Sequence, residues 1–400
     1  MAQLPDETTL KHWGWGISVL PALLWILSWF ALKFVLPAFP SLVTTFGASH
    51  HELQLSIVAF LLCYALTQPF WGSLSERYGR RPILLIALTI CALGSLVVVV
   101  SQSMEVYMLG RCLEGVGAGA ISPVCRAVFV DSYERGVLAK KVAVISSIVA
   151  LMPAVAPLLA GYMVVQLGWR SLFVFFGMVT VVLMILTAWR LPETSRQDER
   201  PGIKVLLEQY AMVFKHRTFW QATGVYALLT GGLIAYYAAT PFWYVFHFKI
   251  SESIFSYFSL LSALCYVAGT FGAKHFIQVH SIGWVQRRGL LFLLGYAVAV
   301  WALSVMPSSI ALLVLMASGF GFLAGWMMPS ASAIAMTSLP SAAGAASAML
   351  TLTIFGLSSG LSWVTMKIDV SNLFAPVAYF SGLALLAGLL NWKMRPDSIT

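Results

Sequence analysis

Charged side chains are scarce in this sequence of 400 residues: only 10% are Asp, Glu, Lys or Arg, against about 25% in a typical soluble domain. Residues 53–75, 82–104 and 289–366 contain none at all. The composition is 60% hydrophobic, with a mean hydropathy of +0.85. One soluble core of this size could not bury so much apolar surface. The scarcity of charge therefore excludes a soluble domain and indicates a membrane protein with many spans.

Cysteine and metal-ligating patterns are scarce as well. The sequence has five cysteines, all in apolar runs and none in a CxxC arrangement: Cys63, Cys91, Cys112, Cys125 and Cys265. They are interpreted as small buried hydrophobic residues. No histidine pair has metal-ligand spacing inside an apolar run, and a phosphate-binding Gly-Lys-Ser/Thr motif is absent. We predict no cofactor, no metal, no enzymatic activity and no ATP-driven pumping, which leaves the proton gradient as the energy source.

The charge-free windows predict twelve helical spans, since about 20 apolar residues cross a bilayer. They lie near residues 15–40, 53–74, 82–101, 106–130, 142–165, 170–189, 218–246, 253–275, 289–306, 309–335, 343–366 and 373–392. One polar connection, residues 190–217, divides them into two sets of six. We predict an all-α membrane protein with two pseudo-symmetric six-helix bundles, 1–190 and 218–400, joined by a cytoplasmic linker at 191–217 and enclosing a shared cavity.

The basic residues predict the orientation, because cytoplasmic loops are enriched in Lys and Arg. With the N-terminus in the cytoplasm, most of the 24 basic residues fall on that side, and only Arg170, Lys249 and Lys367 fall outside. Lys33, Arg111 and Arg126 lie within spans. This distribution explains the net charge of +9 by a membrane surface rather than by nucleic acid. We predict a bacterial inner-membrane protein with both termini in the cytoplasm.

Several stretches have the form of known motifs. They are GSLSERYGRRP (72–82), LGRCLEGVGAGA (109–120), CRAVFVD (125–131), ALMPAVAPLLAG (150–161), GWRSLF (168–173) and LPET (191–194). Together they resemble the major facilitator superfamily and, more narrowly, its twelve-span drug:proton antiporters of the bicyclomycin/chloramphenicol-resistance type. The first stretch resembles the signature between spans 2 and 3, with Glu76 where the family usually has Asp. The resemblance covers the whole chain and is densest in its first half.

The first stretch predicts a conformational latch at the cytoplasmic face. Its members are Gly72, Glu76, Arg77, Gly79, Arg80 and Arg81. The glycines permit a tight turn, the arginines lie at the lipid head groups, and Glu76 suits the positive end of a helix dipole. The resemblance implies that Glu76 contacts the start of span 11 and that Asp131 lies near the arginines. The simpler alternative is a stretch that only fixes the topology.

Ionisable side chains at bilayer depth are costly and therefore suggest function. Arg111 and Glu114 are three residues apart in span 4 and so share a helix face. Glu114 is the candidate proton-binding group, and the alternative is a pair that merely neutralises itself. The resemblance places Arg111 at the family's span-4 arginine, whereas Glu114 departs from the family's usual Gln. Asp131 is a further proton-coupling candidate, near the cytoplasmic edge, for which we favour a structural role.

Lys33 stands where these antiporters usually have an acid. Three interpretations of Lys33 stay open. It pairs with Glu114, it extends to the outer face of the membrane, or it contributes with Arg126 to a positively charged binding cavity. The last alternative favours neutral or anionic substrates over lipophilic cations. Four aromatic residues, Trp25, Trp29, Tyr236 and Tyr266, are predicted walls of the cavity, which suits chemically varied substrates.

Span 5 contains Pro153, Pro157 and Gly161. The prolines remove backbone hydrogen bonds and kink the helix, while the glycine permits close packing. The resemblance implies a seal between the two halves that prevents proton leak, and the alternative is a simple kink.

The function predicted from the sequence is a secondary active transporter that works by alternating access, with proton-coupled multidrug-type efflux as the first choice. A proton-coupled carrier of an anionic metabolite or siderophore is the alternative. A non-transporting sensor is disfavoured because it needs no buried charges. The predicted partners are a small-molecule substrate, protons and membrane lipids, for a chain that acts as a monomer.

Overall fold

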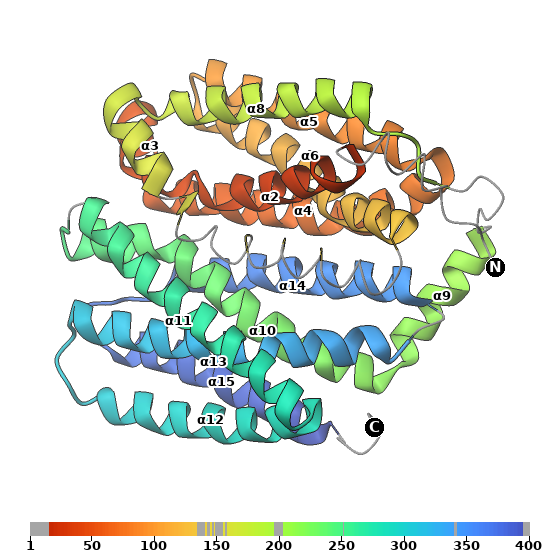
Figure 1. Cartoon of the computed structure of the whole chain (residues 1–400). Coiled ribbons are helices and arrows are strands. Elements are labelled where there is room, and N and C mark those ends of the chain that lie inside the picture. Colours follow the sequence, from red (N-terminus) through yellow and green to blue (C-terminus); the bar gives the residue numbers. More distant parts are fainter. Residues whose placement is uncertain are drawn as a thin grey trace. The chain divides into compact units, whose positions relative to one another are not determined.

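The computed structural model describes residues 16–133, 141, 145, 148, 155–156, 158–195, 203–250, 252–339 and 342–394. Pro153 and Pro157 lie outside these residues, as does the side chain of Lys33. All regular secondary structure in the described part of the chain is helical (Figure 1). The predicted all-α fold class is confirmed.

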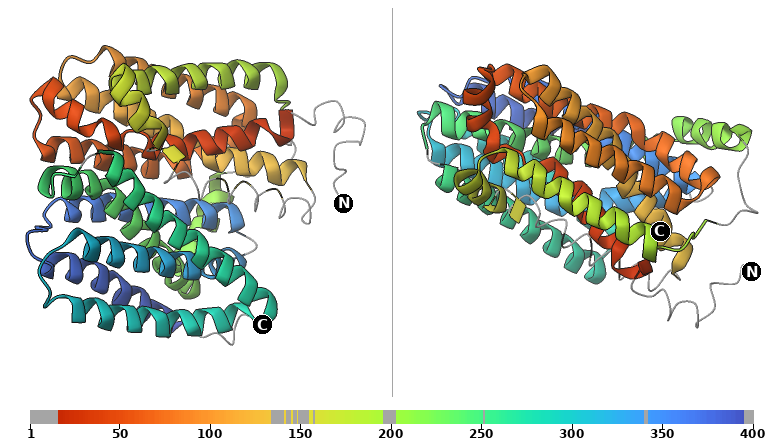
Figure 2. Two further views of the ribbon diagram at one scale, coloured as in Figure 1. Left: turned by 60° about the vertical axis from the view of Figure 1, so that its left-hand side comes forward. Right: turned by 90° about the horizontal axis from the view of Figure 1, so that it is seen from above.

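The chain divides into two compact units, Met1–Leu207 and Glu208–Thr400. The first contains α2 (Leu20–Lys33), a short 3₁₀ helix η1 (Leu36–Ala38), α3 (Phe39–Phe46), α4 (His50–Tyr78), α5 (Arg80–Val100), α6 (Met104–Ser132) and α8 (Arg170–Arg190). In this unit α6 packs against α4 and α5, and α8 packs against α5, as Figures 1 and 2 show. Helix α6 is therefore the centre of the unit. Helix α9 (Ile203–Lys215) follows within the predicted linker and crosses the boundary between the units.

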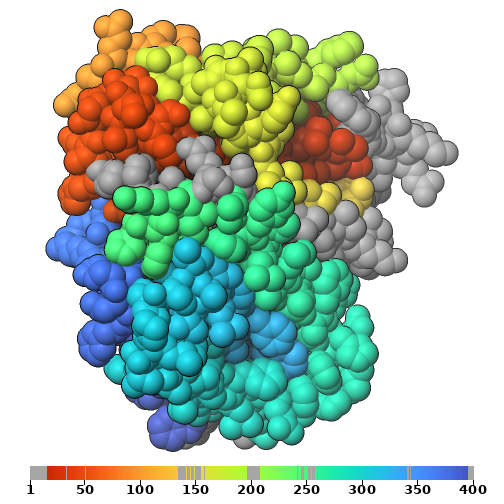
Figure 3. Space-filling view, turned by 90° about the vertical axis from the view of Figure 1, so that its left-hand side faces the viewer, coloured from red at the N-terminus to blue at the C-terminus, as the bar shows by residue number. Residues whose placement is uncertain are grey.

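The second unit has a similar set of long helices. They are α10 (Arg217–Thr240), the π-helix η3 (Pro241–His247), α11 (Glu252–Val279), α12 (Ile282–Leu303), α13 (Ile310–Thr337), α14 (Ala343–Thr365) and α15 (Phe374–Lys393). Here α13 packs against α11 and α10, while α12 packs against α15. A short connection joins α12 to α13 at the left of Figure 1, and Figure 3 is viewed from that side. Helix α13 takes the central place that α6 has in the first unit.

Ten helices of the described residues are long and apolar enough to cross a membrane. Of the other two predicted spans, the one near 142–165 lies mostly outside the described residues and is represented by the apolar helix Leu158–Leu167. The one near 289–306 corresponds to α12, whose apolar part begins only after Arg287 and Arg288. The structure is that of a multi-pass membrane protein.

Local sequence explains where the second long helix begins. Gly47 ends α3 with a left-handed φ of 60°, which glycine adopts at little cost. Helix α4 then starts with a capping box, in which the Ser49 hydroxyl accepts the Glu52 N–H and the Glu52 carboxylate accepts the Ser49 N–H at 2.7 Å. These bonds satisfy donors that a helix start leaves open.

Two predicted spans differ from simple straight helices. The first was expected at 15–40, but its helical run extends to Phe46 and is interrupted at η1, where Pro37 removes a backbone donor. In the seventh, the sequence Ala-Ala-Thr-Pro suggests a broken helix beside the cavity. The structure instead continues through Pro241 as the π-helix η3, a wider turn that accommodates the missing N–H.

Glycines allow the central helices to approach closely. A Cβ atom on Gly94 of α5 would lie 2.7 Å from the backbone nitrogen of Glu114 in α6, and one on Gly117 would lie 2.5 Å from the Ala87 carbonyl. In the second unit, a Cβ on Gly325 of α13 would lie 2.9 Å from the Thr270 nitrogen in α11. Real side chains do not approach backbone so closely, so these contacts require glycine, as is usual between membrane helices.

Candidate functional site

A buried ion pair lies within α6, the helix that packs against α4 and α5 in the first unit. Arg111 and Glu114 are 1% and 0% exposed, and an Nη1 nitrogen of Arg111 contacts Oε2 of Glu114. The second carboxylate oxygen, Oε1, accepts a hydrogen bond from the Ser95 hydroxyl of α5 at 2.8 Å. One helical turn separates the two charges, so the sequence alone brings them to one face. The pair is local in origin, but its burial depends on the neighbouring helices.

Aromatic rings surround the arginine of this pair. The guanidinium lies 4.3 Å from the ring centroid of Phe60 on α4 and 5.9 Å from that of Phe173 on α8. It also donates from Nη2 to the Ala31 carbonyl of α2 at 3.5 Å. Cation–π contacts and a carbonyl partner partly replace the water that the charge has lost. Helices α2, α4 and α8 therefore meet at one arginine.

Arg126 contacts the first helix of its own unit. The residues predicted to line the cavity are divided between the two units. The Arg126 guanidinium lies 5.4 Å from the ring of Trp25 on α2, and Trp29 is half-buried one turn further along. Tyr236 and Tyr266 belong to the second unit, on α10 and α11. Tyr236 is fully buried and shares a 3.0 Å hydrogen bond with the Tyr244 hydroxyl, whereas Tyr266 is half-buried. The placement of Lys33 beside Glu114 or in a cavity stays a prediction.

The latch stretch, which covers the end of α4 and the start of α5, is tied to helix α6 of its own unit. Arg80 Nε donates to Asp131 Oδ2 at 3.0 Å, which joins the start of α5 to the end of α6. Its Nη1 donates to the Ser75 hydroxyl at 2.7 Å. The Arg77 guanidinium lies 5.4 Å from the ring of Tyr78, and a Cβ atom added to Gly72 would meet nothing within 4 Å. Contact between Glu76 and the start of span 11 would join the two units and stays a prediction.

Glu193 contacts the start of α5, although it is not among the site residues that the sequence predicts. Its Oε1 accepts the backbone N–H of Arg80 at 2.8 Å, and its Oε2 accepts that of Arg81 at 3.2 Å. The next residue, Pro82, has no N–H to satisfy. Gly79, at the N-cap position, has a φ of 103° and no side chain to serve as a cap, so a carboxylate from beyond the end of α8 caps α5 instead. The stretch LPET was interpreted only as a span border.

Replacing Glu193 by Ala should loosen the first turn of α5. The change removes both acceptors from the Arg80 and Arg81 amides, and loss of a helix cap costs about 1 kcal/mol. Amide hydrogen exchange, followed by mass spectrometry on peptides covering this turn, should become roughly fivefold faster. Replacing the exposed Glu208 of α9 by Ala is the matched control and should leave this turn unchanged. Unaltered exchange in the Glu193 variant would rule out the cap.

Gly161 is the one member of the predicted span-5 motif that the structure describes. It lies in the helix Leu158–Leu167, where an added Cβ would contact Cβ of Pro37 at 4.0 Å. The motif glycine therefore packs beside the interruption in the first span. Whether the motif forms a seal stays a prediction.

A family model described as Major Facilitator Superfamily matches residues 22–362. The match spans most of the chain, and its long apolar helices fit a transporter fold. The chain belongs to the Major Facilitator Superfamily, whose members are membrane transporters of small molecules.

Relatives whose names state a function agree with the narrower resemblance. The chain is 24% identical to the bicyclomycin resistance protein homolog of Haemophilus influenzae over 373 residues, 90% of this chain and 91% of the relative. It is 28% identical to the chloramphenicol resistance protein of Pseudomonas aeruginosa over 273 residues, 66% of this chain and 63% of that protein. A solved D-xylose–proton symporter matches with a TM-score of 0.77 at 15% identity, covering 97% of this chain and 99% of that one. The last similarity shows the fold alone.

Proposed function

We propose that this chain is a proton-coupled exporter of small molecules, which works by alternating access in a bacterial inner membrane. The observation that carries the proposal is the Arg111–Glu114 pair, fully buried in α6 of a transporter fold. A bilayer protein retains such charges at a cost in stability, which is explained when one of them exchanges a proton during the transport cycle.

The geometry around Glu114 supports an exchange of proton and substrate. Each carboxylate oxygen has one partner, Ser95 or Arg111. A proton on Glu114 cancels its charge and leaves Arg111 without its counter-ion. Arg111 can then shift toward the Ala31 carbonyl, which changes the charge and the shape of the site that a substrate meets. Antiport requires that this protonated arrangement bind substrate less well than the ionised pair, so that proton and substrate exclude each other.

The latch stretch supports rocking of a rigid first unit. The Arg80–Asp131 pair joins α5 to α6, and Glu193 joins the end of α8 to α5. Three helix ends on one side of the unit are thereby linked, so that they move as one body. We propose that Glu76 then forms the contact with the second unit. The alternative, a stretch that fixes topology only, predicts no effect of Glu76→Gln on the conformational equilibrium.

Two substrate classes are candidates. The names of the relatives, bicyclomycin resistance protein homolog and chloramphenicol resistance protein, favour drug-like compounds. The alternative, an anionic metabolite or siderophore, is favoured by the Arg126 guanidinium over Trp25 and by the presence of Lys33 in α2. A positive charge beside an aromatic ring suits a substrate with a carboxylate and an apolar body.

Replacing Glu114 by Gln should abolish proton coupling. Glutamine keeps the shape and one carbonyl oxygen, so Arg111 or Ser95 retains an acceptor, but the side chain cannot take up a proton. In vesicles with an imposed pH gradient, protons that enter down the gradient should drive substrate in the opposite direction through the wild-type protein. The variant should lose at least about 90% of that flux while still exchanging substrate. The panel should include ethidium, chloramphenicol and citrate, which separates the two substrate classes.

Glu105→Gln is the matched control for this experiment. Glu105 is an exposed carboxyl in the first turn of the same helix, so this variant should keep gradient-driven transport. Asp131→Asn tests the other proton-coupling candidate, which pairs with Arg80 at the end of α6. Full coupling in the Glu114 variant, together with loss in the Asp131 variant, would move the proton site to Asp131. If the wild-type protein transports none of the three probes, the proposed function is wrong for these substrate classes, and only membership of the superfamily is retained.

A further inference from the structure

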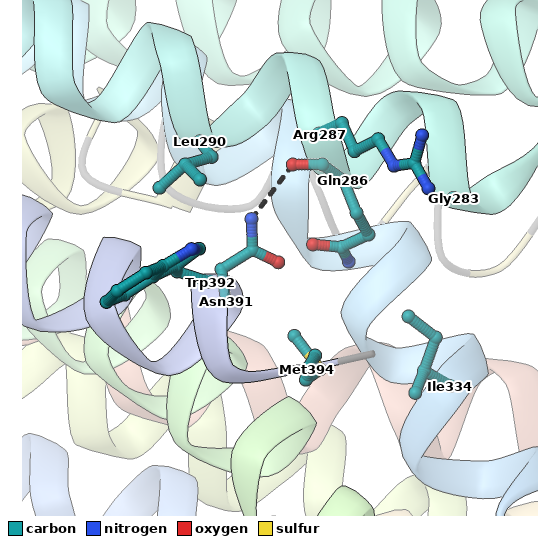
Figure 4. Close-up of a pocket in the computed structure, with 8 residues that line it drawn as sticks. All are labelled: Gly283, Gln286, Arg287, Leu290, Ile334, Asn391, Trp392 and Met394. Carbon is teal, nitrogen blue, oxygen red and sulfur yellow. Dashed lines mark hydrogen bonds between the residues drawn. The ribbon is translucent and has the colours of Figure 1, made fainter. Parts of the chain in front are cut away.

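A cavity of about 280 Å³ lies within the second unit, away from the ionic groups of α6. It is formed by the start of α12, the end of α13 and the end of α15, and Figure 4 shows the residues that line it. Its walls combine the apolar side chains of Leu290 and Ile334 with two amides, Gln286 and Asn391. The amides are unusual there, because both residues are only 6% exposed.

Hydrogen bonds fix the orientation of both amide groups. Gln286 Nε2 donates to the Ser330 hydroxyl at 2.9 Å, and this hydroxyl donates to the Met327 carbonyl at 3.0 Å, so it can only accept from Gln286. Asn391 Nδ2 donates to the Gln286 backbone carbonyl at 2.8 Å. Both nitrogens are therefore in use. The atoms left over are the side-chain oxygens, Oε1 of Gln286 and Oδ1 of Asn391.

These two oxygens have no hydrogen-bond donor among the residues that the structure describes. Figure 4 shows the two oxygens turned toward one another, with the Arg287 guanidinium directed away from them. Buried acceptors without donors are destabilising, and two of them turned toward one space repel each other. A ligand that donates hydrogen bonds to both would remove this penalty. The arrangement thus selects for a donor-rich group.

The volume and the charge narrow the chemistry of that ligand. One water occupies about 30 Å³ of liquid, far less than this cavity, so there is room for a larger group. A primary ammonium offers three N–H donors and suits two carbonyl oxygens. The Arg287 guanidinium in the lining has five N–H donors, and such a group suits an anion. A zwitterion fits both ends when its ammonium lies at the amides and its anion lies toward Arg287.

The position of the cavity points to a lipid. Trp392, one of the lining residues, is 71% exposed on the outside of the unit. The basic residues Arg288 and Lys393 lie at the same helix ends, and the Arg288 guanidinium is 5.3 Å from the ring of Trp284. Exposed tryptophan together with basic side chains is typical of the level of the lipid head groups. A phospholipid can reach a cavity there from the bilayer.

We propose that this cavity binds the head group of phosphatidylethanolamine. Its ammonium donates to Gln286 Oε1 and Asn391 Oδ1, its phosphate lies toward Arg287, and its acyl chains run along the apolar surface near Trp392. The ligand links α12, α13 and α15 at one end of the second unit. This site is independent of the proposed proton site, so failure of one proposal does not affect the other.

The test compares lipids that differ only in the number of N–H donors. The full-length protein in detergent is melted with phosphatidylethanolamine, with its monomethyl and dimethyl forms, and with phosphatidylcholine, all with the same acyl chains. The wild-type melting temperature should be about 3 °C higher with phosphatidylethanolamine than with phosphatidylcholine and should fall stepwise with each methyl group. Soluble phosphoethanolamine at millimolar concentration forms a separate arm and should give no shift.

The variants are Gln286→Met, Asn391→Leu and the two together. Because each variant is compared with itself in the two lipids, a general loss of stability does not affect the result. The difference between the lipids should shrink in each single variant and vanish in the double variant. Gln68→Met, which removes a buried amide of the first unit, is the control and should keep the full difference. Equal melting in both lipids for the wild type, an undiminished difference in the double variant, or an equal shift with soluble phosphoethanolamine would each overturn the lipid site.

Discussion

Replacing Arg111 by Met should lower the melting temperature of the purified protein by about 10 °C. Removal of one partner from a buried ion pair costs about 3 kcal/mol, because Glu114 is left without a counter-ion in a site that excludes water. For a unit of this size, each kcal/mol shifts the melting temperature by about 2–4 °C. The buried thiols of Cys91 and Cys125 provide the measurement, since a thiol-reactive dye labels them only after the helices separate.

Replacing both members of the pair tests why the protein keeps them. Hydrophobic residues of similar volume often substitute for a buried ion pair without loss of stability. Arg111→Met combined with Glu114→Met should therefore melt within a few degrees of the wild type, although it should transport nothing against a gradient. Such recovery would show that the pair is retained for transport. If the single Arg111 variant melts like the wild type, the two charges are in contact with water and the proposed proton site is wrong.

Much of the fold follows from the sequence because bilayer insertion has simple rules. A span must be long and apolar, and charges mark its ends. The charge-free windows therefore place the long helices, and the polar stretch at 190–217 contains α9. The interruption near Pro37 was harder to place, since a proline can end a helix, kink it or convert one turn. Pro241 is a second example: there the proline converts the helix to the wider turn of the π-helix η3 instead of ending it.

The site was predictable where its partners are close in sequence. Arg111 and Glu114 share a face through their spacing alone. Ser95 and Glu193 belong to other parts of the chain, and only tertiary packing brings them to Glu114 and to the start of α5. A signal for Glu193 existed, since the acid follows directly after a span whose end should lie near the arginines of the latch stretch.

The amide pair in the second unit illustrates another limit. Gln286 and Asn391 carry no charge, so a search for ionisable residues within spans passes over them. Uncharged amides in apolar helices are themselves a signal, because each needs hydrogen-bond partners that lipid does not provide. Here the partners are on α13 and α12, which the sequence pattern alone does not pair.

Replacing Gly325 by Ala should have the largest effect on the second unit. The new methyl group would collide with the Tyr266 carbonyl and lie 2.9 Å from the Thr270 nitrogen, both of them backbone atoms of α11. Backbone atoms cannot rotate away as a side chain can. Helices α11 and α13 must therefore move apart and lose packing contacts along the length over which they touch. We expect a loss of about 3 kcal/mol or more and a melting temperature lower by about 10 °C. The thiol of Cys265 on α11 reports the separation.

The facing helix supplies a second, independent argument. Gly269 of α11 would collide in the same way with the Phe322 carbonyl of α13, so Gly269→Ala alone should be as damaging as Gly325→Ala. Once one methyl group has separated the helices, the second finds more room, and the double variant should lose less stability than the sum of the two. Gly295→Ala is the matched control. Gly295 is helical with nothing within 4 Å of the added atom, and alanine favours the helix, so this variant should melt at or slightly above the wild-type temperature. Equal melting of the Gly295 and Gly325 variants would mean that α11 and α13 do not approach each other as closely as this structure has them.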